Sequence, residues 1–135
     1  MSDRPLVLIV DDNPGDVDLI SLALEDTAIP LEVVCAYDGK EAVRVLEAMS
    51  PVDRRRCRLV LLDLNMPRMS GRDFLAWLRQ QAAFKHLPVI ILTSSTLPAE
   101  KAECLALGAN DYWFKEPKYD LLQRQVVGVR RYLVA

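Results

Sequence analysis

Apolar runs of strand length alternate with amphipathic helical patterns along the chain, and this alternation restricts the fold more than any other feature of the sequence. Leu6–Val10 is a continuous apolar run, as expected of a strand that is covered on both faces. Asn13 and Pro14 follow as a helix N-cap and first helical residue, and apolar side chains then recur at helical spacing to about Thr27. The chain therefore begins with a strand and a helix.

The same alternation continues toward the C-terminal end. Further strands are expected at residues 31–36, 58–63, 88–93 and 111–115. Helices are expected after the caps Asp38 and Ser70, at Pro98 and after Pro117, and a polar loop is expected at residues 50–57. Five strands alternating with five helices imply right-handed βαβ crossovers and a parallel, doubly wound α/β sheet. The 135 residues suffice for one domain, and no internal repeat or interdomain linker interrupts them.

Polar side chains stand where the expected strands end. Asp11 and Asp12 follow the first strand, and Asp63 ends the third. Thr93 and Lys115 end the fourth and fifth strands. Because ligands of a doubly wound sheet bind outside the carboxyl ends of the strands, we expect these five side chains to share one pocket.

The chemistry of these residues favours phosphoryl transfer. Three carboxylates at close range raise one another's pKa values unless a cation neutralises them. An all-oxygen set without His or Cys suits Mg²⁺ better than zinc. Asp63 could then act as a nucleophile and form an aspartyl-phosphate. Lys115 and the metal would stabilise the phosphoryl oxygens, and Thr93 would donate a hydrogen bond.

The residues around these positions resemble the receiver domain of bacterial two-component response regulators. The resemblance covers essentially the whole chain and is carried by Val10-Asp11-Asp12-Asn13, Leu62-Asp63-Leu64-Asn65-Met66-Pro67 with Gly71, Leu92-Thr93-Ser94, and Tyr112 three residues before Lys115. It implies a flavodoxin-like sheet with strand order 2-1-3-4-5 and a single receiver domain over residues 1–135, without an output domain. The segment 12–16 and the long stretch before the third strand are more narrowly similar to stand-alone receivers that partner bacterial phytochrome kinases.

The resemblance also implies roles for individual residues. Asp63 would take a phosphoryl group from a phosphohistidine, and the protein would not act as an enzyme on a separate substrate. Thr93 would swing toward the phosphoryl group and let Tyr112 turn inward, so that the surface of the protein changes. The implied Mg²⁺ ligands are Asp12, Asp63 and the backbone carbonyl of Asn65, with Asp11 contributing largely through water.

One departure from the family pattern lies beside the site. The family normally has a Lys-Pro pair with a cis bond, whereas here Glu116 stands between Lys115 and Pro117. Glu116 could pair with Lys115, and the bond to Pro117 could still be cis. A site impaired in this way leaves a phosphorylation-independent binding module as the alternative function. A Mg²⁺-dependent phosphatase using Asp63 is a third hypothesis, but it would need a second acid and a cap over the substrate.

Composition indicates the compartment and restricts the partners. The net charge of −2 gives no general affinity for nucleic acid or anionic membrane, and no apolar run approaches the length of a membrane span. Cys35, Cys57 and Cys104 have no metal-ligand spacing, so free thiols and a reducing cytoplasm are expected. The resemblance to receiver domains implies that the partner is a sensor histidine kinase, including a bacterial phytochrome, or a histidine phosphotransfer domain.

Two surface features remain. The arginines at positions 54, 55, 56 and 58 favour a solvated or partner-facing loop over a nucleic-acid patch. The last helix carries more apolar residues than one face can bury. This favours a homodimer through that helix and the fifth strand, and the alternative is that some of these residues are simply exposed at the C-terminus. The residues behind this prediction are Val127, Val129, Tyr132 and Leu133.

Overall fold

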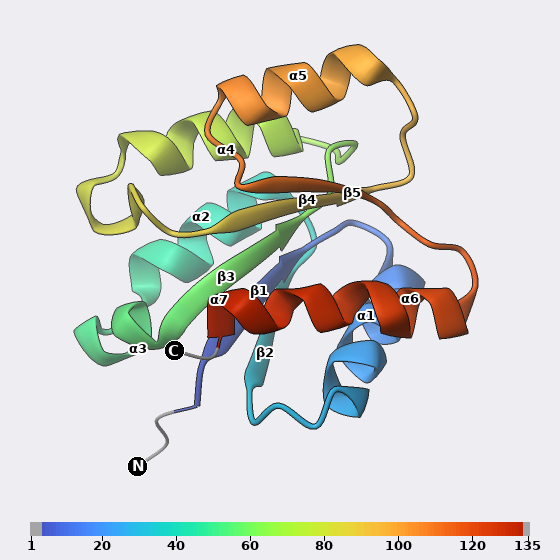
Figure 1. Ribbon diagram of the computed structural model, residues 1–135. Helices are drawn as coiled ribbons and strands as arrows, with labels where there is room; N and C mark the ends of the chain where they lie inside the picture. Colours follow the sequence, from blue (N-terminus) through green and yellow to red (C-terminus); the bar gives the residue numbers. More distant parts are fainter. Residues whose placement is uncertain (1–3, 134–135) are drawn as a thin grey trace.

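The computed structural model describes residues 4–133, which contain a five-stranded parallel sheet in the order β2-β1-β3-β4-β5 (Figure 1). The strands are β1 (Leu6–Val10), β2 (Glu32–Ala36), β3 (Cys57–Leu62), β4 (Val89–Thr93) and β5 (Asp111–Phe114). The expected fold class and strand order are confirmed. Because strand order reverses beside β1, the loops that follow β1 and β3 border one crevice.

Helices cover both faces of this sheet (Figure 1). One face carries α1 (Pro14–Asp26) and α6 (Tyr119–Val126), and the other carries α2 (Gly39–Ala48), α4 (Gly71–Gln80) and α5 (Pro98–Ala106). Strand β1 is buried on both sides, because Val7 and Ile9 join the core under α1 and α6 while Leu8 and Val10 join the opposite core. This double burial explains why its sequence is a continuous apolar run.

Capping side chains fix where three of the helices begin. The side chains of Asn13, Asp38 and Ser70 accept hydrogen bonds from backbone amides three residues later, at 3.1, 2.8 and 3.2 Å. These contacts satisfy amide groups that a helix N-terminus otherwise leaves without partners. The predicted starts of α1, α2 and α4 are therefore confirmed.

The segment predicted as a polar loop contains a helix, so this prediction is wrong. Helix α3 spans Pro51–Arg56, with Ser50 as its cap accepting from Asp53 N at 3.1 Å. None of its residues is buried, so it has no apolar stripe by which the sequence could reveal it. Arg56 stabilises the helix from its last turn by pairing with Asp53 at 2.9 Å and with Glu32 at 2.6 Å.

The C-terminal helical segment is interrupted rather than continuous. Helix α6 passes into a 3-10 turn at Val127–Val129 and then into α7 (Arg130–Leu133). A Cβ on Gly128 would lie 3.0 Å from the ring of Trp113, so the missing side chain makes room for the indole. Trp113 therefore packs against this segment. Of the apolar residues expected in excess here, Val129 and Leu133 are buried, while Val127 is 51% exposed.

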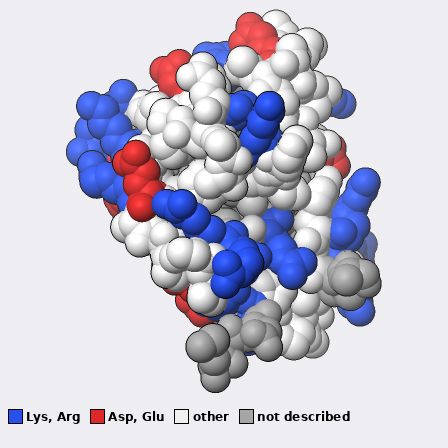
Figure 2. Space-filling model, turned by 90° about the vertical axis from the view of Figure 1, so that its left-hand side faces the viewer, with Lys and Arg blue, Asp and Glu red and all other residues white. Residues whose placement is uncertain are grey.

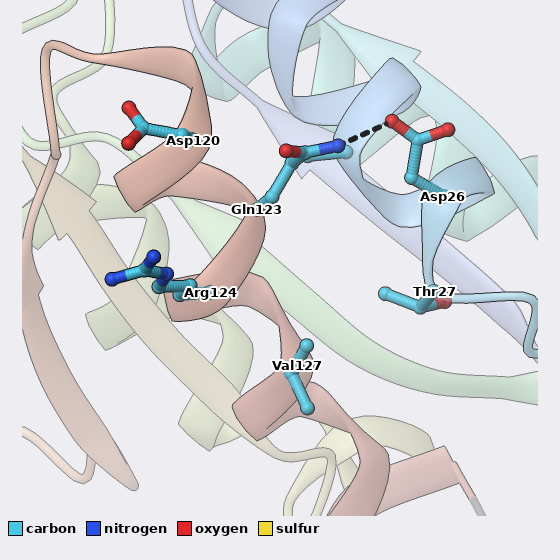
Figure 3. A pocket seen from close by; sticks show the side chains of 7 residues that line it. Asp26, Thr27, Asp120, Gln123, Arg124 and Val127 are labelled. Carbon is cyan, nitrogen blue, oxygen red and sulfur yellow. Dashed lines mark hydrogen bonds between the residues drawn. The ribbon is translucent and has the colours of Figure 1, made fainter.

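Helices α1 and α6 lie side by side and are joined by polar contacts at their exposed edge. Asp26 accepts hydrogen bonds from the Tyr119 hydroxyl at 2.5 Å and from Gln123 Nε2 at 2.7 Å. Figure 3 shows Gln123 directed at Asp26 above a shallow pocket of about 320 Å³. These contacts hold the start of α6 against the end of α1.

The described residues also bear on two expectations from composition. The thiols of Cys35, Cys57 and Cys104 are free. Within residues 4–133, no helix has both the length and the apolar character needed to cross a bilayer.

Candidate functional site

Three carboxylates meet at the carboxyl ends of β1 and β3, beside the start of α1. Asp11, Asp12 and Asp63 each offer a carboxylate oxygen, and these oxygens lie within 4.8 Å of one another. Asp11 is 2% exposed and Asp63 is 9% exposed, whereas Asp12 faces solvent. The predicted convergence of strand-end acids is therefore present in the structure.

This geometry makes an ionised Asp63 costly. Burial raises the pKa of Asp63 to about 6, with Asp11 as the next largest cause, while Lys115 partly opposes the shift. Asp63 Oδ1 accepts one hydrogen bond, from Leu64 N at 2.9 Å. A divalent cation would relieve the repulsion, and a set of carboxylate oxygens is the donor chemistry that hard cations prefer. The residues present thus fit such an ion.

Lys115 enters the same site from the end of β5. Its Nζ donates hydrogen bonds to Asp11 Oδ2 at 2.7 Å and to Asp16 Oδ2 at 2.9 Å. Burial alone would lower the pKa of Lys115, but the hydrogen bonds to these two carboxylates outweigh burial and raise it. The pair with Glu116 that the sequence left open is absent among the described residues, because the Lys115 side chain points into the site and pairs with Asp11 and Asp16.

The backbone after β5 keeps Lys115 in register. Lys115 N donates to Thr93 O at 2.6 Å, which extends the β4–β5 pairing by one residue. Residues 4–133 contain no cis peptide bond, so the bond between Glu116 and Pro117 is trans rather than the cis form left open by the sequence. The altered Lys-Glu-Pro sequence therefore leaves the ammonium group inside the acidic site.

The proposed switch residues lie on the same side of the sheet as α5. Thr93 is fully buried, and its Oγ1 accepts a hydrogen bond from Ser95 N at 3.2 Å. Tyr112 packs against the core beneath α4 and α5, and its buried hydroxyl has no hydrogen-bond partner among the described residues. Burial raises the pKa of Tyr112, and the nearby Glu100 adds to the shift. A phenol in this position gains a hydrogen bond wherever a rearrangement offers one.

The loop between β3 and α4 is held by two constraints. A Cβ on Gly71 would lie 2.2 Å from Asp63 O, so only glycine lets α4 begin against the backbone of Asp63. Arg68 adopts a positive φ of 66°, and its guanidinium pairs with the buried carboxylate of Asp38. Asn65 is exposed in this loop, two residues beyond Asp63.

Sequence reasoning missed two of these contacts. It assigned neither Asp16 nor Arg68 a contact at the site. The spacing within residues 12–16 was a signal for Asp16, because the third helical position after the cap turns back toward the strand end. No local signal identified the pair between Arg68 and Asp38, which are far apart in sequence.

Comparison with known proteins decides which family this arrangement belongs to. Residues 7–126 match the model of the response regulator receiver domain. The chain belongs to the response regulator receiver family. Rcp1 of Synechocystis is 30% identical over 128 residues, a match that covers 94% of this chain and 87% of Rcp1.

Solved structures support the same assignment. The phosphorylated cyanobacterial phytochrome response regulator RcpA superposes on this receiver with a TM-score of 0.85 and 31% identity, covering 98% of this chain and 95% of RcpA. The Mn²⁺-bound form of Rcp1 superposes with a TM-score of 0.83 and 29% identity, covering 98% and 96%. This receiver is therefore similar to phytochrome-associated response regulators in both sequence and structure.

Receiver domains also occur as parts of larger proteins. A probable cyclic di-GMP phosphodiesterase of Vibrio cholerae is 37% identical over 120 residues, which is 89% of this chain. This receiver spans only about a quarter of that phosphodiesterase, so the likeness concerns the receiver domain.

Proposed function

We propose that this receiver accepts a phosphoryl group on Asp63 from a phosphohistidine of a sensor histidine kinase, and signals through a change in its surface. The observation that carries the proposal is the convergence of Asp63 with Asp11 and Asp12 within 4.8 Å, with Lys115 bonded to Asp11 at 2.7 Å. A nucleophilic carboxylate, acidic metal ligands and a cation at one strand edge are the parts that phosphoryl transfer requires.

The proposed transfer forms one P–O bond and breaks one P–N bond. An Asp63 carboxylate oxygen attacks phosphorus, the P–N bond of the phosphohistidine breaks, and the departing imidazole nitrogen keeps the bonding electrons and gains a proton. The hydrogen bond from Leu64 N orients the Asp63 carboxylate for this attack. Lys115 leaves Asp16 and neutralises the phosphoryl oxygens. Asp63 is thus the acceptor, and no separate substrate is turned over.

The cation that we propose is Mg²⁺, held by Asp11, Asp12, Asp63 and the backbone carbonyl of Asn65. When bound, it supplies positive charge beside the transferring oxygens. The donor set and the raised pKa of Asp63 support this proposal. The Mn²⁺-bound form of Rcp1 supports a divalent ion in a similar site.

The switch that we propose uses Thr93 and Tyr112. Thr93 Oγ1 would leave Ser95 N and donate a hydrogen bond to the phosphoryl group. Tyr112 would then turn toward the vacated space, where its buried hydroxyl can find the partner it now lacks. Since Leu97 and Phe114 share an open pocket with Tyr112, this movement would reshape an exposed apolar surface between β5 and α5.

The partners follow from this surface and from the relatives. We propose a bacterial phytochrome or another sensor histidine kinase as the phosphoryl donor, with the receiver acting in the cytoplasm. We place a homodimer contact on the β5–α5 surface, where Leu97 is 60% exposed and Phe114 is 44% exposed. The last helix exposes less apolar surface than expected, because Val129 and Leu133 are buried.

A titration with beryllofluoride and Mg²⁺ tests the proposal. The fluorescence of Trp77 and Trp113 should change saturably in the wild-type protein and should not change in Asp63→Asn. A wild-type protein that binds Mg²⁺ but gives no beryllofluoride response, and is not labelled by acetyl phosphate, would contradict it. The binding-module alternative rested on a pair between Lys115 and Glu116. Lys115 bonds instead to Asp11 and Asp16, which does not support that alternative.

A further inference from the structure

The end of the sheet where the strands begin, opposite to the phosphoacceptor, carries a concentration of positive charge. Figure 2 shows lysine and arginine side chains gathered on this side of the molecule, although the net charge of the protein is −2. We define the basic edge by Arg54 and Arg55 of α3, Arg58 of β3, and Lys85 and His86 before β4. All five residues are exposed.

A pocket of about 290 Å³ opens within the basic edge. Arg54, Arg58 and His86 line it together with Phe84 and Tyr132, and none of its lining residues is acidic. The Arg54 guanidinium lies 5.6 Å from the centroid of the Phe84 ring, so one cation is held against the aromatic wall. The pocket combines an apolar and aromatic interior with positive charge at its rim.

The charge at this rim is not neutralised within the described part of the chain. The nearby acids Glu32 and Asp53 are both paired with Arg56. Apart from its contact with the Phe84 ring, Arg54 makes only a long hydrogen bond, 3.5 Å, to the backbone carbonyl of Glu47 in α2. Across residues 4–133, the side chain of Arg58 has no hydrogen-bond or ion-pair partner. Clustered cations without partners repel one another, and an acidic ligand would relieve that cost.

We propose that the basic edge binds an acidic segment of a partner protein, with one large apolar side chain of that segment in the pocket and flanking carboxylates on Arg54 and Arg58. Arginine and tyrosine around a small apolar pocket are typical of the centre of protein interfaces. Nucleic acid fits this pocket less well, because contacts to phosphates need rows of cations and no apolar cavity.

This site is separate from the proposed phosphoryl-transfer site. The pocket lies at the amino ends of β3 and β4, whereas Asp63 lies beyond the carboxyl end of β3. A partner bound at the basic edge would leave Asp63 open to its phosphoryl donor. The receiver could therefore be tethered by one edge while it is phosphorylated at the other.

The test is an NMR titration of the ¹⁵N-labelled protein, residues 1–135, in low salt. The probe is a synthetic peptide with a central phenylalanine flanked on both sides by glutamates. We expect saturable shifts at the amides of Arg54, Arg58, His86 and Tyr132, which weaken as salt is added. Shifts confined to the β5–α5 surface, or no shifts, would overturn the proposal. Because Asp63 is not phosphorylated in this experiment, the result is independent of the function proposed above.

Matched variants separate the site from general charge effects. Arg54→Glu/Arg58→Glu should weaken peptide binding by about tenfold or more, as for charge reversal at a contact pair. Lys101→Glu/Arg124→Glu makes the same charge change at exposed positions elsewhere and should have little effect. An equal loss in both double variants would contradict the proposal. Arg58→Gln is a milder variant whose thermal unfolding should match that of the wild type.

Two further probes test the chemistry of the ligand. A peptide with alanine in place of the central phenylalanine should bind more weakly, and equal binding would show that the pocket is not used. A single-stranded oligonucleotide of the same charge should also bind more weakly than the phenylalanine peptide. Tighter binding of the oligonucleotide would overturn the proposal in favour of nucleic acid.

Discussion

The ammonium group of Lys115 lies 2.9 Å from the carboxylate of Asp16, in the first turn of α1. Lys115 is also bonded to Asp11 at 2.7 Å, whereas no hydrogen bond joins it to Asp63 within the described residues. In the proposed phosphorylated state, Lys115 contacts the phosphoryl group. Asp16 therefore competes with that group for the ammonium and stabilises the unphosphorylated arrangement.

Replacing Asp16 by asparagine should strengthen binding of beryllofluoride. The pair is partly exposed, with Asp16 at 35%, so we expect a gain of about twofold to fivefold in affinity. The α1 cap survives, because Asn13 accepts from the backbone amide of residue 16. Tryptophan fluorescence gives the affinity, with Asp18→Asn as a control at an exposed acid of the same helix. Weaker binding in Asp16→Asn would instead mean that Asp16 steers Lys115 toward the phosphoryl group.

The raised pKa of Asp63 predicts how stability depends on pH in metal-free buffer. The folded pKa of about 6 lies above the ordinary value of 3.8, so the folded state binds this proton more tightly than the unfolded state does. The stabilisation from the protonated group is complete below pH 4 and is lost as pH rises through 6. Asp63→Asn should therefore be more stable than wild type at pH 8, by about 1–2 kcal/mol.

Urea unfolding with a chelator at pH 8 and at pH 4 measures this difference. The two proteins should have nearly equal free energies of unfolding at the lower pH. Added Mg²⁺ should reduce the difference in free energy of unfolding between the two proteins at pH 8, because it stabilises the ionised carboxylates of the wild type. An Asp63→Asn protein that is less stable than wild type at pH 8 would refute the electrostatic account.

Asp12 offers a test of the metal site with little structural cost. Its side chain is exposed, so Asp12→Ala should change the free energy of unfolding in chelator by less than about 0.5 kcal/mol. Removing one of the three clustered carboxylates should nevertheless weaken Mg²⁺ binding by about tenfold. A Mg²⁺ titration of tryptophan fluorescence, with Asp18→Ala as control, measures the effect. Unchanged affinity would remove Asp12 from the ligand set.

Gly71 should tolerate no side chain. A Cβ there would lie 2.2 Å from Asp63 O, so Gly71→Ala must displace either α4 or the phosphoacceptor backbone. We expect a loss of about 2–3 kcal/mol in the free energy of unfolding, as for overpacking against rigid neighbours. Gly15→Ala is the control, because its Cβ would meet only the end of a side chain, at 3.2 Å. Equal stability of both variants would contradict the close approach.

The dimer surface can be tested by introducing a lysine, in separate variants, at each of two exposed apolar residues. Phe114 and Val127 are 44% and 51% exposed, and they lie on β5 and on the last helical segment respectively. With beryllofluoride present, Phe114→Lys should sediment as a monomer, whereas Val127→Lys should remain dimeric. The reverse result would place the contact on the last helix. A wild-type protein that stays monomeric at high concentration would exclude both surfaces.

The strand ends were predictable from sequence because two local properties coincide there. Leu6–Val10 is apolar on both faces and runs directly into Asp11, so the position of the carboxylate follows from the strand alone. Capping residues such as Asp38 act over three residues and were equally predictable. Helix α3 was missed because it buries no residue, although Ser50 and Pro51 repeat the cap signal of α1.

Contacts between distant elements were not predictable in the same way. The pair between Lys115 and Asp16 depends on how α1 is inclined toward the end of β5, and the two residues are 99 positions apart. Leu105 belongs to the apolar pattern of α5 yet is 43% exposed, because that helix buries only Cys104. Such outcomes depend on the tilt of a helix, which a single sequence does not encode locally.

The five parallel strands also place charged side chains of opposite sign at the two ends of the sheet. Carboxylates gather where the strands end, and unpaired cations gather where they begin. Near a negatively charged partner or surface, the protein would be turned basic edge first before any contact forms. Asp63 would then face outward, toward whatever approaches from solution. The direction of the strands thus determines which way Asp63 faces when the basic edge approaches a negatively charged partner.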